Sequence, residues 1–155
     1  MNQLELLVKS RQFALGPQEG QIEFTIGLDT VNHVVTNLVG PTRTVTMDTL
    51  DNVLERERPS LIKLDVEGFE SEVLRGATKT LGRSELKAII TEDRSAPVLE
   101  ALYAAGFVEQ SYDPFTRDLE PEKRQRHNTL FVRDRNFVQQ RLIEASRVFV
   151  LNKSL

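Results

Sequence analysis

The sequence predicts an α/β fold built on one sheet, and three observations lead to that prediction. Two apolar, strand-like segments, residues 61–66 and 86–91, are each followed by an amphipathic helical pattern. Strands that alternate with helices are typical of parallel sheets with helical crossovers. Residues 107–112 and 128–133 have the pattern of two further strands, and the connection between them, 113–127, shows no helical pattern. Because a parallel crossover usually contains a helix, these last two strands are expected to pair antiparallel.

The amino-terminal third of the chain contains three strand candidates, at residues 11–15, 21–27 and 43–47. The second of them alternates polar and apolar side chains, which is the signature of a half-buried strand. The polar segment 28–41 that follows it is expected to be a loop. Thr49 can cap a short helix over residues 50–56, because its side-chain oxygen accepts hydrogen bonds from free amide groups. Asp51 in this helix is expected to have a structural role.

Apolar spacing predicts the helices that cover the sheet. Residues 70–81 carry one apolar stripe, and Gly82 follows as a natural end of the helix. The stripe consists of Val73, Leu74, Ala77 and Leu81. Phe69, just before this helix, is expected to lie in the core. Residues 96–105 form a second helix of the same kind, and residues 136–150 are expected to form a closing helix.

Composition bounds the class of protein before any motif is considered. The chain has 155 residues, and with 39% hydrophobic and 28% charged residues it is expected to form one globular domain over residues 1–155. The absence of cysteine excludes a disulfide scaffold, a thiolate zinc site and a cysteine nucleophile. A net charge of −3 with mixed signs gives no basic footprint for nucleic acid. No apolar run approaches the ~20 residues of a membrane span and no signal peptide is recognisable, so a cytoplasmic protein is expected.

Two charged residues, Lys63 and Asp65, lie inside the apolar strand 61–66. Side chains alternate along a strand, so these two share one face with Leu61. An unpaired buried charge is costly, and the two residues are close enough to form an ion pair or to share a ligand. A salt bridge at the end of the sheet is the simpler interpretation. The position of Asp65 at the carboxyl end of the strand favours a ligand site, because open α/β sheets bind ligands there.

Acidic residues follow two strands that are expected to be neighbours. Glu67 and Gly68 form the turn after the strand just described, and Glu92 follows residues 86–91. Parallel neighbours would bring Asp65, Glu67 and Glu92 together as an acidic rim. Such a rim can act as a general base, bind substrate hydroxyls or hold a hard cation such as magnesium. The alternatives are a helix cap for Glu67 and a solvated edge for the whole rim.

Polar residues in two further loops are weaker candidates for substrate contacts. His127 and Asn128 enter the last predicted strand, and Asp29 and Asn32 lie in the polar loop 28–41. For both loops, plain exposure to solvent is the alternative.

A longer pattern of residues resembles the FkbM family of methyltransferases. It runs through residues 49–51 (TLD), 61–68 (LIKLDVEG) and 72–77 (EVLRGA), and continues with Glu92 and Gly106-Phe107. The run IKLDVEG…EVLRGA is more specific than any single glycine motif, and the resemblance covers approximately residues 11–134. It implies an S-adenosylmethionine-dependent enzyme that methylates oxygen on a sugar or a secondary metabolite.

The same resemblance implies a fold and a set of roles. The fold would be a Rossmann-like class I methyltransferase sheet with helices on both faces and an antiparallel strand near the carboxyl terminus. Asp65 and Glu67 would lie at the methyl-transfer site as base or substrate ligand, with Lys63 orienting the acids, and Asp65 and Gly68 would contact the cofactor. The expected contacts to a small hydroxyl-bearing acceptor are Glu92, His127, Asn128, Asp29 and Asn32. No metal ligands are assigned, although magnesium held by the acids is an open variant of the mechanism.

One part of the family pattern is absent from this chain. The cofactor loop is normally glycine-rich and follows the first strand, whereas no two of the eight glycines here are spaced as G-x-G. The chain is therefore expected to be the carboxyl-terminal part of an FkbM-type domain that lacks the first strands of its sheet. Such a sheet exposes a strand edge, which predicts a homodimer. The alternative function is accordingly a non-catalytic remnant, or an interaction module that needs a partner for the cofactor half.

Overall fold

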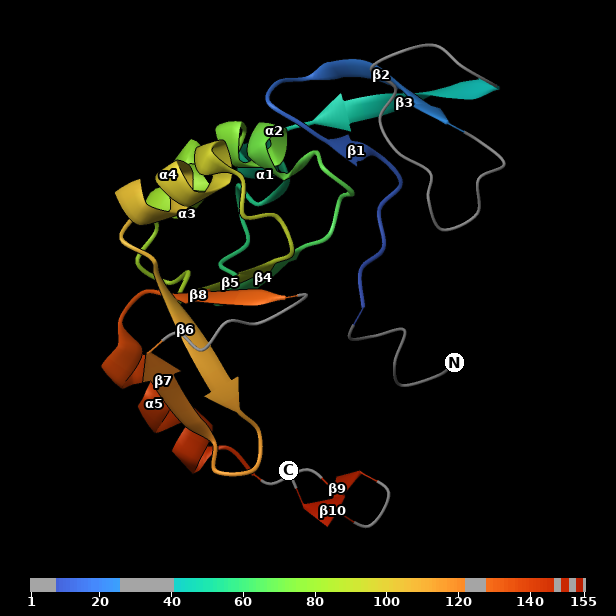
Figure 1. The fold of residues 1–155 in the computed structure, drawn as a ribbon. Helices are drawn as coiled ribbons and strands as arrows, with labels where there is room; N and C mark the ends of the chain where they lie inside the picture. Colours follow the sequence, from blue (N-terminus) through green and yellow to red (C-terminus); the bar gives the residue numbers. More distant parts are fainter. Residues whose placement is uncertain (1–7, 26–40, 122–127, 147–148, 151–152, 155) are drawn as a thin grey trace.

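The computed structural model describes residues 8–25, 41–121, 128–146, 149–150 and 153–154 (Figure 1). The strands are β1 (Ala14–Leu15), β2 (Gly20–Thr25), β3 (Thr42–Asp48), β4 (Leu61–Leu64), β5 (Ala88–Thr91), β6 (Val108–Asp113), β7 (Asp118–Pro121), β8 (Thr129–Val132), β9 (Phe149–Val150) and β10 (Lys153–Ser154). The helices are α1 (Leu50–Val53), α2 (Glu70–Arg75), α3 (Thr78–Gly82), α4 (Ala96–Ala104) and α5 (Arg135–Glu144). None of these helices is long and apolar enough to cross a membrane.

The central feature is a five-stranded sheet with the order β4-β5-β8-β6-β7. β4 and β5 are parallel neighbours, as the strand–helix–strand pattern predicts. β8 lies antiparallel between β5 and β6, which confirms the predicted antiparallel pairing of the last two long strands. The connection 113–127, for which the sequence shows no helical pattern, contains a strand that was not predicted, β7. The left-handed backbone of Arg117 (φ 64°) and amide hydrogen bonds to the Asp113 carboxylate form the tight turn that leads into this strand.

Helices lie on both faces of this sheet. Residues from α2, α3 and α4 pack with Leu64, Ile89 and Phe131 into the larger core cluster. Side chains alternate along each strand, so Ala88 and Val132 point to the opposite face, where they pack with residues of β7 and α5. Figure 1 shows α1 to α4 grouped on one side of the sheet and α5 on the other. The predicted apolar stripe of residues 70–81 is buried in the larger cluster, and Phe69 packs against it, as expected.

The first three strands form a sheet of their own, with the order β1-β3-β2, rather than extending the central sheet. β1 runs parallel to β3 and β2 antiparallel to it. β3 leads directly into α1, whose first turn is capped as predicted. The Thr49 hydroxyl accepts a hydrogen bond from the Asn52 amide at 3.1 Å.

The helix predicted over residues 70–81 is divided into α2 and α3, and close packing explains the division. A Cβ atom on Gly76 would lie 2.1 Å from the carbonyl oxygen of Gly16, so the backbone of this position lies directly against the first sheet. The Asp51 carboxylate then caps α3 by accepting hydrogen bonds from the amides of Lys79 and Thr80 at 2.9 and 2.7 Å. Asp51 is therefore structural, as expected, but it caps a different helix from the one that contains it.

Two predicted boundaries are also corrected. The strand predicted over residues 61–66 ends at Leu64, so Asp65 and Val66 belong to the turn. The closing helix predicted over residues 136–150 is shorter, because α5 ends at Glu144 and Ala145 adopts extended backbone angles. Phe149 and Val150, an aromatic and a β-branched residue that favour strands, instead form β9, which pairs with β10.

Candidate functional site

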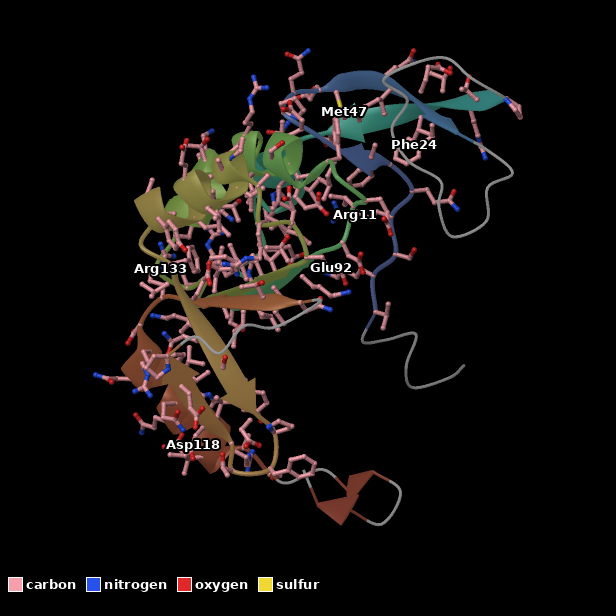
Figure 2. The ribbon with its side chains drawn as sticks, in the orientation of Figure 1. Arg11, Phe24, Met47, Glu92, Asp118 and Arg133 are labelled. Atoms are coloured by element: carbon pink, nitrogen blue, oxygen red, sulfur yellow. The ribbon has the colours of Figure 1, made fainter. Side chains whose placement is uncertain are left out.

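A small acidic cavity lies where β4 and β5 end side by side. It has a volume of about 260 Å³. The residues that line it are Asp65, Glu67, Gly68, Glu70, Glu92 and Asp93. The predicted acidic rim is thus assembled in the structure, because parallel pairing of β4 with β5 brings the two strand ends to the same edge. Figure 2 shows Glu92 at this edge, with Arg133 at the opposite end of the sheet.

The turn after β4 has an uncommon backbone conformation. Glu67 adopts a φ of 50° and Gly68 a φ of 89°, two successive residues in the left-handed region. Glycine takes this conformation freely, whereas a residue with a side chain adopts it at a cost of about 1–2 kcal/mol. A Cβ on Gly68 would meet no atom within 4 Å, so the space above this residue is open. The turn therefore exposes Glu67 and leaves room for a ligand over Gly68.

Lys63 and Asp65 form the ion pair that their spacing predicts. The Nζ atom of Lys63 lies 2.5 Å from Oδ2 of Asp65, and each side chain is about half exposed. The hydrogen bond to Asp65 raises the pKa of Lys63, and the nearby charge of Glu92 adds to the same effect. Lys63 thus remains charged and holds the Asp65 carboxylate beside the acidic cavity.

Glu70 is a site residue that the sequence analysis missed. The residue is only 3% exposed, although it lines the acidic cavity. Oε1 accepts a hydrogen bond from the Val66 amide at 3.3 Å. Oε2 is buried and has no hydrogen-bond partner among the described residues. One feature of the sequence could have indicated this role: Glu70 is the first residue of the helix that follows the glycine turn.

The predicted substrate residues are only partly described. Asn128 lies at the start of β8 and donates a hydrogen bond through Nδ2 to Oε1 of Glu92 at 3.1 Å, so these two candidates do come together. Asp93, which also lines the cavity, holds the entry to α4 by accepting hydrogen bonds from the amide and the hydroxyl of Ser95. The remaining predicted substrate residues, His127, Asp29 and Asn32, lie outside the described residues.

The geometry limits the chemistry that these acids can perform. In the part of the chain that the structure describes, no group of three or more acidic, histidine or cysteine side chains is arranged to hold a metal ion. The half-exposed Asp65 and the exposed Glu67 are open to a ligand. Carboxylates in this setting accept protons or hydrogen bonds from bound hydroxyl groups.

Comparison with known proteins identifies the family. Residues 2–119, well over half of the chain, match the family model of the Methyltransferase FkbM domain. Neither the curated proteins nor the solved structures gave a significant match. The matched region includes β4, β5 and every residue that lines the acidic cavity. The resemblance carried by the LIKLDVEG and EVLRGA segments is therefore confirmed, and the chain belongs to the FkbM methyltransferase domain family.

Proposed function

We propose that the chain is an S-adenosylmethionine-dependent O-methyltransferase whose acceptor hydroxyl binds at the acidic cavity. One observation carries the proposal: Asp65, Glu67 and Glu92 converge at the carboxyl ends of two parallel strands, in a chain of a methyltransferase family. Ligands of open α/β sheets bind outside this edge. The acceptor class we propose is a hydroxyl group of a sugar or a secondary metabolite.

The strand arrangement supports a Rossmann-like methyltransferase sheet. β6 is antiparallel to β8, which is antiparallel to β5, so β5 and β6 point the same way with one reversed strand between them. This matches the antiparallel strand near the carboxyl terminus that we expect for such a sheet. The helices on both faces agree with the same interpretation.

The residues at the cavity suit the cofactor in two respects. S-adenosylmethionine, when bound, supplies a methyl group on a positively charged sulfonium, and the cavity is lined by carboxylates. The open space over Gly68 lets a ligand approach the backbone closely. Asp65 and Gly68 are the residues that we propose to contact the cofactor.

The chain's own acids perform the remaining chemistry. An alcohol must lose its proton as its oxygen forms the new bond to carbon, and Asp65 or Glu67 accepts that proton. Lys63 keeps the Asp65 carboxylate in place through the 2.5 Å contact. Glu92, tied to Asn128, is positioned to accept a hydrogen bond from a further hydroxyl of the acceptor.

Substitution of the two candidate bases tests this function. Asp65→Asn and Glu67→Gln keep the size of each side chain and remove its charge. Loss of the true base is expected to lower methyl transfer by about 10²–10⁴-fold, measured as product formation with a panel of hydroxyl acceptors. Glu100→Gln, on the exposed surface of α4, is the matched control. Full turnover in both cavity variants would show that these acids have no catalytic role. Activity that a chelator abolishes would instead favour the magnesium variant of the mechanism.

An interaction module is the second candidate, and the edge of the central sheet favours it. Among the described residues β4 pairs with β5 alone. A cavity of about 700 Å³ with a largely apolar lining adjoins this edge, and Leu61 beside it is 51% exposed. Antiparallel pairing of two copies about Leu64 would place Lys63 of one copy opposite Asp65 of the other. We propose this homodimer as the assembly of the non-catalytic alternative.

Charge reversal tests the homodimer. Lys63→Asp is expected to yield a monomer in analytical ultracentrifugation, and Lys63→Asp combined with Asp65→Lys is expected to restore the dimer. A wild-type chain that is monomeric at all concentrations would rule this pairing out.

A further inference from the structure

The acidic cavity holds more negative charge than a single proton transfer requires. Five of the six residues that line it are acidic. The lysine beside them, Lys63, is already hydrogen-bonded to Asp65. All of these carboxylates attract a ligand that carries positive charge. A neutral polyol gains no such attraction.

Glu70 gives an independent sign that the cavity takes a proton donor. The residue is only 3% exposed, and its Oε2 atom lacks a hydrogen-bond partner among the described residues. Buried carboxylate oxygens without partners are costly, and they are rare in folded proteins. Since Glu70 lines the cavity, a ligand with a compact donor group can supply the missing hydrogen bond.

The arrangement suits an organic cation better than a metal ion. Magnesium and calcium need several oxygen atoms within about 2.0–2.6 Å of one point. No such group is found within the described residues. An ammonium group instead donates up to three hydrogen bonds of about 2.8 Å to acceptors that lie further apart. It is also a compact charge, which suits a cavity of about 260 Å³.

We propose that the acidic cavity is a subsite for a primary ammonium group on the hydroxyl-bearing methyl acceptor. Glu70 and Glu92 accept hydrogen bonds from that group, and Asp65 or Glu67 serves the hydroxyl to be methylated. The substrate class is then an amino sugar or another amino alcohol. This inference rests on the proposed function, and it specifies the acceptor that the same site binds.

Binding of two matched sugars to the full chain tests the proposal. Glucosamine and glucose differ at one position, where an ammonium group replaces a hydroxyl. Titration below neutral pH, followed by backbone-amide NMR, should show glucosamine shifting the signals of Gly68 and Glu92. The affinity for glucosamine is expected to be at least about tenfold higher than that for glucose, as a charge-assisted hydrogen bond predicts. Equal affinity for the two sugars, or no binding of glucosamine, would overturn the proposal.

Variants link this binding to the named carboxylates. Glu70→Gln and Glu92→Gln are each expected to lower glucosamine affinity by roughly tenfold, whereas Glu100→Gln should leave it unchanged. Glu92 is exposed, so its variant remains informative if Glu70→Gln fails to fold. Glucosamine affinity that is unchanged in Glu92→Gln would contradict the proposed role of this residue and overturn the subsite.

A second titration separates the acceptor from the cofactor, whose amino-acid portion also carries an ammonium group. Saturation with S-adenosylhomocysteine should leave glucosamine binding in place. Displacement of glucosamine would show that the ammonium group of the cofactor occupies the part of the cavity beside Glu70 and Glu92, and it would overturn the inference. S-adenosylhomocysteine binding without any glucosamine binding would overturn the inference and leave the proposed methyltransferase function standing.

Discussion

The guanidinium of Arg133 lies over the ring of Phe107, with its central carbon 4.6 Å from the ring centroid. The same group donates hydrogen bonds to backbone carbonyls at the ends of α3 and α4 and before β5. These acceptors are the carbonyls of Leu81, Arg83, Leu86 and Ala105. One side chain therefore fastens the ends of α3 and α4 to the segment before β5, at the end of the sheet opposite the acidic cavity.

Replacement of this arginine should be costly even by another cation. Lysine cannot reproduce the planar fork that reaches several carbonyls at once. Arg133→Lys is expected to lower the free energy of unfolding by roughly 2–3 kcal/mol, because buried carbonyls lose their partners. Urea denaturation measures the change. Arg75→Lys is the control, since Arg75 is 69% exposed and forms a surface ion pair with Glu72. An equal, small effect of both substitutions would contradict the fastening role.

Two glycines of the helical layer should respond to alanine in opposite ways. Gly76→Ala forces a Cβ against the Gly16 carbonyl and is expected to cost about 1–3 kcal/mol of stability. Gly82→Ala meets no atom within 4 Å and is expected to be neutral or to stabilise by up to about 1 kcal/mol. Thermal unfolding of both variants provides the comparison. Equal stability of Gly76→Ala and Gly82→Ala would contradict the close contact between Gly76 and the Gly16 carbonyl.

The left-handed conformation of Glu67 allows chemistry to be separated from folding. Glu67→Gly removes the carboxylate and also relieves the backbone strain at φ 50°. The variant should be at least as stable as the wild type, with a gain of up to about 1 kcal/mol. If Glu67 is the base, methyl transfer falls in this variant although the fold is intact. A marked loss of stability would show instead that the Glu67 side chain supports the turn.

Stability at low pH should depend on Asp134. Its hydrogen bond from Lys87, followed by that from the Phe137 amide, holds the pKa of Asp134 below the ordinary value of 3.8. A carboxyl group with a lowered pKa in the folded state stabilises the protein above its unfolded pKa, and the stabilisation is lost as the pH falls through the folded pKa.

The stability difference between the wild type and Asp134→Asn should therefore be largest near neutral pH and shrink below about pH 3.8. Asparagine tolerates the left-handed backbone at this position, so the substitution tests the charge. Urea denaturation at several pH values measures the difference. If the stability difference between the wild type and Asp134→Asn did not shrink at low pH, the interaction with Lys87 would be excluded as its source.

The sequence predicted the central part of the fold and the acidic rim for clear physical reasons. Apolar strand-like segments and helical patterns located β4, β5, α4 and β8, and parallel pairing followed from the helices between strands. That pairing alone brings Asp65 and Glu92 to one edge. The apolar pattern within each segment was enough to predict these elements, because each segment buries its apolar face against elements that are near it in the sequence.

The missed features depend on contacts between residues far apart in the chain. The division of the helix at Gly76 requires the approach of Gly16, sixty positions earlier, and a cap from Asp51. Strand β7 contains Leu119, which is buried against Ala88 and Val132; its short, charged segment has no apolar alternation to reveal it. Glu70 has the position of an ordinary first-turn acid, and only burial distinguishes it from a solvated one.

Calorimetric titration of the purified chain with S-adenosylhomocysteine tests the central claim most directly, because it requires no knowledge of the acceptor. If the acidic cavity forms part of a working cofactor site, the wild type binds in the micromolar range and Asp65→Asn binds more weakly, while Glu100→Gln binds as the wild type does. A folded chain that shows no binding, or that binds equally well with Asp65→Asn, would contradict the assignment of this cavity to methyl transfer.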